Sequence, residues 1–259
     1  MVAFTETIKN PSFRYPSKVP DTCLRFVEAN NDYIDCGNHF NLTPVNGQCT
    51  ISGWVLPRDL TNAVDMLSTD RDAAQAGTAR IGISTAGFFR YQVLYSTDSP
   101  FNADCTSTIS AELNKWHHVA FIIDNLNDRV TFVVNGVVDV VDFSWSTGTS
   151  YVTTYTNFNI GRFHNNVSGT FYCDAEMANF RIYEDYLLPV EEAQAQYIRG
   201  VNYYGHSDET GLSAAYHLNE GTGTIAVDSY EDTQNHGTIQ GSGVQEDRWI
   251  NTQSRTYRE

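Results

Sequence analysis

Short apolar stretches alternate with polar residues along most of the chain. In the stretch 22–28, apolar Leu24 and Phe26 alternate with Arg25 and Glu28, and this spacing places apolar side chains on one face of a strand. Glycine, asparagine and aspartate interrupt the apolar stretches about every ten residues, which is typical of short strands joined by tight turns. The pattern predicts an all-β antiparallel domain, either a sandwich or a barrel.

The strongest local signal lies at 117–143. Three apolar stretches are separated there by an Asn- and Asp-rich turn and by the pair Asn135-Gly136. An Asn-Gly pair accepts the left-handed φ angles of a two-residue hairpin. This segment therefore predicts three consecutive antiparallel strands.

A helical signal occurs at 189–199. Pro189 suits the first turn of a helix, and Gly200 suits its end. Glu191 and Glu192 favour the positive N-terminal end. We expect one short helix near 189–199 in an otherwise β protein.

Composition divides the chain into four segments. They are an extended N-terminal arm (1–21), a strand-rich body (22–200), a C-terminal β segment (201–250) and a polar tail (251–259). The arm holds three prolines, which prevent regular sheet pairing. We expect the arm to lie along its own sandwich or along a neighbouring subunit.

Charge and hydropathy narrow the range of partners. The sequence holds 16 Lys and Arg against 31 Asp and Glu, a net charge of −15. A protein that binds phosphate backbones needs clustered basic residues, so no nucleic-acid partner is expected. No apolar run approaches the roughly 18 residues of a membrane span, so no membrane insertion is expected.

The cysteines and the N-terminus indicate the cellular compartment in which the protein is made. The five cysteines show no metal-type spacing, and the first residues lack the charged start, apolar stretch and cleavage site of a secretory signal. These features favour synthesis in the cytoplasm with the cysteines as thiols. A bridge between Cys36 and Cys49 is the alternative that spacing leaves open.

Five segments follow one another in a characteristic order. They are LRFVEANNDYIDCG, CTISGWVLP, KWHHVAFIIDNLNDRVTFVVNGVV, FNIGRF and AEMANFRIYEDYLLPVEEAQAQYIRG. Together they cover about residues 22–200 and resemble the laminin-G-like, concanavalin A-like lectin and glucanase family. The resemblance implies an antiparallel two-sheet jelly-roll sandwich.

A further match lies out of order. Residues 212–249 resemble the opening segment of the same family, which there precedes the part that matches 22–60. This segment either completes the sandwich from the C-terminal side or packs against a neighbouring subunit. We favour the first arrangement, because three short strands cannot build a core alone.

Some members of this family are glycoside hydrolases with acidic residues at alternate positions of one strand. The nearest pattern here is Asp174 and Glu176, which on a strand would face the same way about 7 Å apart. The third acid is missing, because Ala178 and Asn179 follow. We interpret the pattern as a solvated acid at a strand edge and expect no enzymatic activity.

The resemblance also implies a possible calcium site. Many relatives hold Ca²⁺ with Asp, Asn and backbone oxygens, the ligands that a hard cation prefers. Acidic turns are plentiful, but none has the spacing of a self-contained loop site. The candidate metal ligands are Asp32 and Asp174, and no other cofactor is expected.

A sugar site needs an aromatic platform beside hydrogen-bonding side chains. The loops 143–157 and 162–172 offer both. The candidate glycan-binding residues are Trp145, Tyr151, Tyr155, His164 and Asn165. The alternative interpretation is that these aromatic residues only pack at the rim and in the core of the sandwich. Tyr203 and Tyr204 are expected to pack the helix against the C-terminal segment.

The sequence as a whole favours a non-catalytic structural or binding module. A polar arm and tail around a compact sandwich, with sheet edges that invite symmetric assembly, favour a virion surface component such as a capsid-decorating or fibre-type protein. Such a protein is made in the cytoplasm and displayed on the virion, and its partners are copies of itself, neighbouring structural subunits and cell-surface glycans. The alternatives are a calcium-assisted lectin or adhesin, and a glycoside hydrolase of the same fold.

Overall fold

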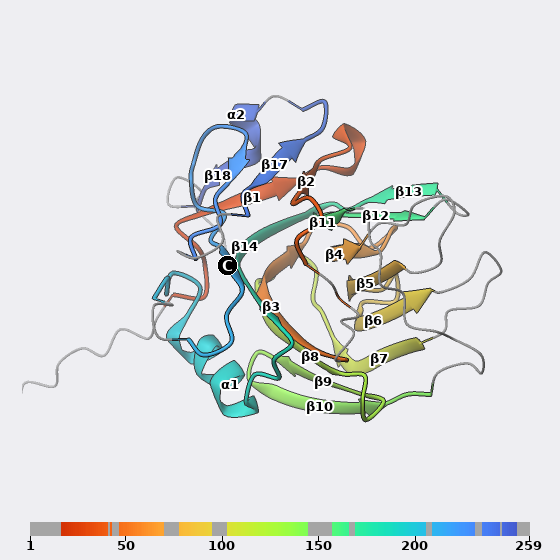
Figure 1. Cartoon of the computed structure of the whole chain (residues 1–259). Helices are drawn as coiled ribbons and strands as arrows, with labels where there is room; N and C mark the ends of the chain where they lie inside the picture. The colour runs from red at the N-terminus through yellow and green to blue at the C-terminus, as the bar shows by residue number, and fades with distance from the viewer. Residues whose placement is uncertain are drawn as a thin grey trace, which may run out of the picture.

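The computed structural model shows two antiparallel sheets that face each other, with a ten-residue helix on the outside (Figure 1). The described residues are 17–40, 42, 47–69, 78–94, 103–144, 157–165, 169–205, 209–230, 235–243 and 245–252. This sandwich confirms the predicted all-β fold class.

The first sheet is eight-stranded. Its strands, in spatial order, are β10 (Val137–Asp142), β9 (Arg129–Val134), β8 (His117–Asp124), β3 (Gln48–Pro57), β14 (Ala175–Glu184), β1 (Thr22–Phe26) and β18 (Trp249–Asn251), and β15 (Ala214–Tyr216) also pairs with β14. The meander predicted for 117–143 is β8, β9 and β10. Asn135 and Gly136 have φ angles of 50° and 81° between β9 and β10, as a tight Asn-Gly hairpin requires.

The second sheet is also eight-stranded. Its strands, in spatial order, are β16 (Ile225–Ala226), β17 (Gly237–Gln240), β2 (Tyr33–Asp35), β11 (Phe158–Ile160), β4 (Val64–Thr69), β5 (Thr78–Ile83), β6 (Phe88–Leu94) and β7 (Ala103–Ser110). A separate hairpin of β12 (Arg162–Asn165) and β13 (Gly169–Tyr172) packs beside β4 and β5 (Figure 1).

The stretch 158–163, a single strand by its pattern, is split in the structure. Gly161 has a φ of 82° and separates β11 from β12. A Cβ at this position would overlap the ring of Phe26. Glycine therefore serves two needs here, a left-handed backbone and a close approach.

Interlocking aromatic rings fill the space between the sheets. Phe89 on β6 and Phe121 on β8 meet edge to face with 6.5 Å between ring centroids, and Phe121 meets Phe132 on β9 at 5.6 Å. All three side chains are fully buried. Edge-to-face pairs add about 0.5–1.5 kcal/mol beyond the burial of apolar area, so these contacts fix how the two sheets face each other.

Residues 201–250 contribute strands to both sheets. β15 pairs with β14 and β18 pairs with β1 in the first sheet, whereas β17 pairs with β2 in the second. In the structure this segment therefore lies on the sandwich of its own chain.

The predicted helix is present as α1 (Val190–Arg199). It follows Pro189 and ends before Gly200, whose φ is 86°. Tyr197 stacks on Trp54 of β3 at 6.0 Å between centroids, and the helix covers the outer side of the first sheet (Figure 1).

Two single turns complete the described secondary structure, η1 (Glu28–Asn30) and α2 (Gln245–Arg248). No helix among the described residues is long and apolar enough to cross a membrane. All five cysteines are buried thiols without a disulfide, so the Cys36–Cys49 bridge is not formed.

The described end of the N-terminal arm, residues 17–21, lies against its own chain. The Val201 N–H donates to the Ser17 carbonyl at 3.1 Å, just beyond the end of α1. Lys18 Nζ lies 3.9 Å from the centroid of the Tyr197 ring, a cation–π contact. The rest of the arm is outside the described residues.

His118 on β8 is buried in the aromatic layer beneath α1. Its ring centroid lies 5.2 Å from that of Trp54 and 6.2 Å from that of Tyr197. Burial, and after it the positive charges of Arg181 and Lys18, lowers the pKa of His118 to about 3. His118 is therefore neutral in the folded protein at neutral and mildly acidic pH.

Acidification is expected to destabilise the fold through His118. The unfolded chain binds a proton there below the ordinary pKa of 6.5, whereas the folded protein does not. The free energy of unfolding should therefore fall by about 2 kcal/mol through this residue between pH 7 and pH 5. Urea unfolding at both pH values measures the loss in the wild type and in His118→Phe, and equal losses in the two proteins would contradict the expectation.

Candidate ligand-binding site

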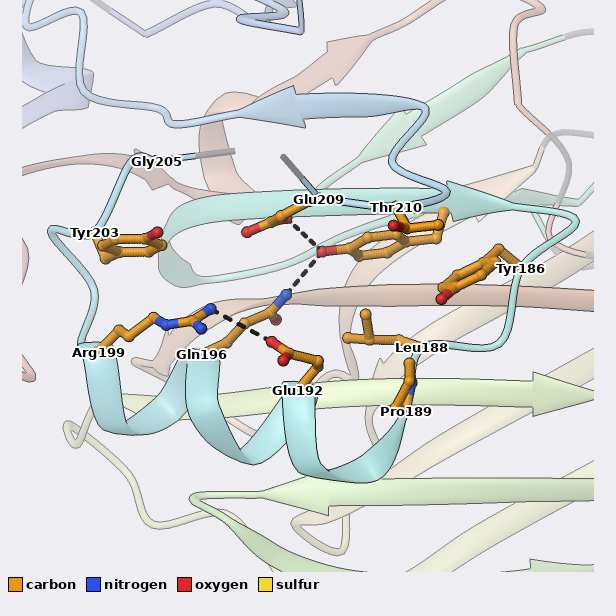
Figure 2. Close-up of a pocket in the computed structure, with 11 residues that line it drawn as sticks. Tyr186, Leu188, Pro189, Glu192, Gln196, Arg199, Tyr203, Gly205, Glu209 and Thr210 are labelled. Carbon is orange, nitrogen blue, oxygen red and sulfur yellow. Dashed lines mark hydrogen bonds and ion pairs between the residues drawn. The ribbon is translucent and has the colours of Figure 1, made fainter. Parts of the chain in front are cut away.

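A pocket of about 320 Å³ opens beside α1 on the outer side of the first sheet (Figure 2). It lies where the end of β14, helix α1 and the residues after the helix meet. We call it the tyrosine pocket, and its polar and aromatic lining includes Tyr183, Tyr186, Glu192, Gln196, Tyr203 and Glu209. The described lining residues all lie between 183 and 210, so a strand end, a helix and the segment after it form the cavity together.

The placement of α1 forms one wall of the tyrosine pocket. Buried Leu188 packs the turn before the helix onto the sheet, and Ala193 is fully buried beneath the helix. Glu192 and Arg199 are partly exposed and line the pocket beside this buried face, where their carboxylate and guanidinium form an ion pair at 3.5 Å. This amphipathic pattern holds the helix on the sheet and leaves charged groups at the rim.

A row of hydrogen bonds crosses the floor of the pocket (Figure 2). Gln196 Nε2 donates to Tyr183 Oη at 2.7 Å, and the Tyr183 hydroxyl donates to Glu209 Oε2 at 2.6 Å. Arg181 Nε lies 3.2 Å from the same Glu209 oxygen. Burial, and after it the Glu209 charge, raises the pKa of Tyr183 well above its ordinary value, so its hydroxyl remains a neutral donor.

Two tyrosine rings stand at opposite ends of the pocket (Figure 2). Tyr203 is 39% exposed and carries the Arg199 guanidinium 5.2 Å from its ring centroid. Tyr186 packs against Tyr183 with 6.3 Å between centroids. The arrangement offers aromatic faces on both sides of a polar floor.

Two acceptors of the pocket lining, Gln196 Oε1 and Glu209 Oε1, lack a hydrogen-bond partner among the described residues, and the carboxylate is the stronger acceptor. Glu209 Oε1 is buried. A buried acceptor without a partner is costly, and a ligand that donates to it removes that cost. The combination of aromatic faces, fixed donors and an open acceptor suits a small polyhydroxylated ligand.

The residues predicted to bind sugar are elsewhere in the chain. Trp145, Tyr151 and Tyr155 lie outside the described residues. His164 is on β12, where its Nδ1 lies 2.7 Å from Thr170 Oγ1 across the hairpin. Asn165 is the last residue of β12, and its side chain is outside what the structure describes. His164 is not among the residues that line the tyrosine pocket, and the glycan-binding role of all five residues stays a prediction.

The two predicted metal ligands lie in ion pairs with different arginines. Asp32 is buried, with Oδ1 2.9 Å from Arg248 Nη2 and Oδ2 accepting the Val27 N–H at 3.2 Å. Asp174 Oδ1 lies 3.6 Å from Arg25 Nη2. Across the described part of the chain, no three His, Cys, Asp or Glu side chains gather as metal ligands. The calcium site stays a prediction.

Glu176 is not the solvated acid at a strand edge that the sequence suggested. β14 lies inside the first sheet between β3 and β1, and Glu176 is fully buried. Arg58 holds its Oε1 with Nη2 at 2.6 Å and Nε at 3.2 Å. The interpretation failed because a local pattern does not show how many neighbours a strand will have.

The tyrosine pocket was not found from the sequence. Tyr203 was expected only to pack the helix against the C-terminal segment, and Tyr183 and Tyr186 attracted no functional interpretation. Three tyrosines around one helix are a weak signal. They meet only because α1 folds back onto the sheet and the following residues return past it.

The fold defines an all-β jelly-roll domain. A family model described as the Concanavalin A-like lectin/glucanases superfamily matches residues 28–194, more than half of the chain. The chain therefore belongs to this superfamily, which confirms the resemblance drawn from the sequence.

Solved structures share the fold at low sequence identity. A candidate carbohydrate-binding protein from Bacteroides ovatus is 18% identical with a TM-score of 0.57, and the match covers 87% of this chain and 59% of that one. A heptameric SAP-like pentraxin from Limulus polyphemus is 14% identical with a TM-score of 0.54, covering 89% of this chain and 94% of that one. No curated protein matches the chain.

Proposed function

We propose that the chain is a non-catalytic carbohydrate-binding module whose tyrosine pocket binds a neutral sugar. The observation that carries the proposal is the exposed ring of Tyr203 beside the hydrogen-bonded row of Gln196, Tyr183 and Glu209. Aromatic rings pack on the apolar faces of sugars, and fixed polar groups select their hydroxyls. The superfamily includes lectins by name, and the Bacteroides ovatus relative has the same fold, which supports the proposal.

Each polar group has a separate role in this proposal. Glu209 Oε1 accepts a hydrogen bond from a sugar hydroxyl, because it has no partner among the described residues. Its other oxygen is engaged by Tyr183 and Arg181. Two such partners hold the carboxylate in place as an acceptor, which suits binding better than proton transfer during catalysis.

Display on a virion surface, which the sequence analysis favoured, is a more specific form of this proposal. The solved relatives named above are a candidate carbohydrate-binding protein and a pentraxin. The setting therefore draws no support from them, and the proposed function concerns the binding module wherever it is displayed.

Tyr203→Ala is expected to weaken sugar binding about tenfold, because it removes the exposed stacking face. A glycan array of the full-length protein identifies a ligand, and titration of that ligand measures the variants. Ile198→Ala is the matched control, since Ile198 is 64% exposed on the adjacent helix α1 and is not among the residues that line the pocket. A blank array, or equal affinity in Tyr203→Ala and wild type, would overturn the proposal.

Two further arms of the same experiment test the alternatives. Loss of binding in Trp145→Ala with Tyr203→Ala unaffected would place the site on the loop predicted from the sequence. Loss of binding in chelator, restored by calcium, would favour the calcium-assisted lectin. The proposed site predicts the same affinity in both buffers.

A further inference from the structure

A second pocket, of about 300 Å³, lies on the second sheet beside the β12–β13 hairpin. Its lining includes Asn62, Asp65, Arg80, Arg90, Phe163 and Phe171. Asn62 Nδ2 donates to Glu28 Oε1 at 2.6 Å at one side. We call it the arginine pocket, and it shares no lining residue with the tyrosine pocket.

The floor of the arginine pocket is a row of residues across three strands. Asp65 on β4 is opposite Gly82 on β5, and Gly82 is opposite Arg90 on β6. Directly opposite residues of antiparallel strands share a face, and Arg80, two residues before Gly82, points the same way. Because Gly82 has no side chain, both guanidiniums reach towards Asp65, at 3.5 Å from Arg80 and 3.8 Å from Arg90.

Charged side chains of both signs meet in this floor. Two guanidiniums face one carboxylate, whose side chain is only 3% exposed. Burial lowers the pKa of Arg80 to about 10 and lowers that of Arg90, so both remain charged at neutral pH. Asp104 also attracts both arginines, but it is exposed to solvent, which screens its charge. Among the described residues that line the pocket, buried guanidiniums therefore outnumber buried carboxylates, in a chain of net charge −15.

Arg90 has donor capacity that its neighbours do not use. Its Nε is buried without a hydrogen-bond partner among the described residues, and the separation of 3.8 Å from Asp65 exceeds hydrogen-bond length. A guanidinium presents paired donors in a planar fork that matches a carboxylate. An incoming carboxylate would therefore supply the missing acceptors.

An aromatic wall stands beside these arginines. The Phe163 ring lies 4.2 Å from the Arg80 guanidinium carbon, which keeps that group in place. Phe171 stacks on Phe163 with 6.2 Å between centroids and is 38% exposed. A ring-shaped ligand can pack on this exposed face while its acidic group reaches the floor.

We propose that Arg90 and Arg80, with the Phe163–Phe171 wall, bind the carboxylate of a small acidic ring compound, namely an acidic sugar. This site goes beyond the proposed function, which assigns a neutral sugar to the tyrosine pocket. Hexuronic acids and nonulosonic acids share the required chemistry, a carboxylate on a saturated ring. The volume of about 300 Å³ is at the lower end of the usual range for small-molecule pockets.

The test is a titration of the full-length protein with glucuronic acid and with N-acetylneuraminic acid. Glucuronic acid methyl ester is the neutral match, and inorganic phosphate is the competing anion. We expect saturable binding of at least one acid. The acid that binds more tightly shows whether the ligand is a hexuronic acid or a nonulosonic acid. The ester should bind at least tenfold more weakly than glucuronic acid if that acid is the ligand, and neutral glycerol should not compete. No saturable binding of either acid, or tighter binding of phosphate than of both, would overturn the proposal.

Two variants with opposite expected effects test whether the acid binds in the arginine pocket. Arg90→Gln should weaken binding of the acid at least tenfold, whereas Asp65→Asn should strengthen it by removing the competing carboxylate at nearly constant shape. Thermal melting shows that each variant is folded. Tyr203→Ala, in the other pocket, should leave this affinity unchanged, so the failure of one site is distinguishable from the failure of the other. An affinity for the acid that neither variant changes would overturn the proposal.

Discussion

Arg58→Met is expected to destabilise the protein by about 3–5 kcal/mol, because it leaves the buried Glu176 carboxylate without its guanidinium. Glu176 is fully buried in the middle of the first sheet, and Arg58 reaches it through Nη2 at 2.6 Å and Nε at 3.2 Å. Methionine retains much of the apolar stem, so the change removes mainly charge and hydrogen bonds. Urea unfolding at pH 7 measures the loss.

An exposed ion pair provides the matched control for Arg58. Arg129 and Asp142 form a pair at 2.7 Å whose side chains are 50% and 68% exposed. Arg129→Met should therefore change the free energy of unfolding by less than about 1 kcal/mol. The double variant Arg58→Met/Glu176→Leu should recover much of the stability lost in the single variant. Similar losses for Arg58→Met and Arg129→Met would show that burial of Glu176 does not govern the energetics.

Gly82→Ala is expected to cost more than about 3 kcal/mol, above the usual range for an added methyl group. β4 has an irregular register between Asp65 and Leu67, and a Cβ on Gly82 would overlap the Val64 carbonyl oxygen. It would also lie 3.0 Å from the Met66 nitrogen. These are backbone atoms, which cannot rotate away as a flexible side chain can. Thermal and urea unfolding measure the effect.

Gly221→Ala separates this clash from the general effect of replacing glycine. No heavy atom lies within 4 Å of a Cβ built at Gly221, although its φ is 74°. The expected cost is about 1–2 kcal/mol, from the left-handed backbone alone. If Gly82→Ala were no more destabilising than Gly221→Ala, the close approach of β4 and β5 would not be a rigid feature of the sheet.

Local signals were sufficient for much of the fold. The turn at Asn135-Gly136 predicted the β8–β9–β10 meander, and Pro189 with Gly200 predicted the ends of α1 to within a residue. These features depend on the backbone preferences of a few adjacent residues. The split at Gly161 was missed, because the need for glycine there comes from the Phe26 ring of a distant strand.

The sites were less predictable, because each depends on non-local pairing. Nothing adjacent to Glu176 in the sequence indicates that Arg58 will meet it or that β14 will lie between two neighbours. Tyr183 and Tyr203 share a pocket only after α1 packs on the sheet. The aromatic residues in the sequence instead suggested a sugar site on the loops 143–157 and 162–172. The chemistry needed for sugar binding was a sound guide, but the residues that supply it in the tyrosine pocket were not identifiable from spacing.

The pairing of β1 with β18 determines how the molecule would respond to tension. Thr22 is opposite Asn251 in this antiparallel pair, and Thr252 Oγ1 donates to the Asp21 carbonyl at 3.3 Å. The chain therefore enters and leaves the first sheet at the same corner. A force that separates these two points would load the hydrogen bonds of the pair one after another, as in opening a zipper, and not all at once, as in shearing. The domain would then begin to yield at this seam, with β18 peeling from β1 before the aromatic contacts between the sheets carry any load.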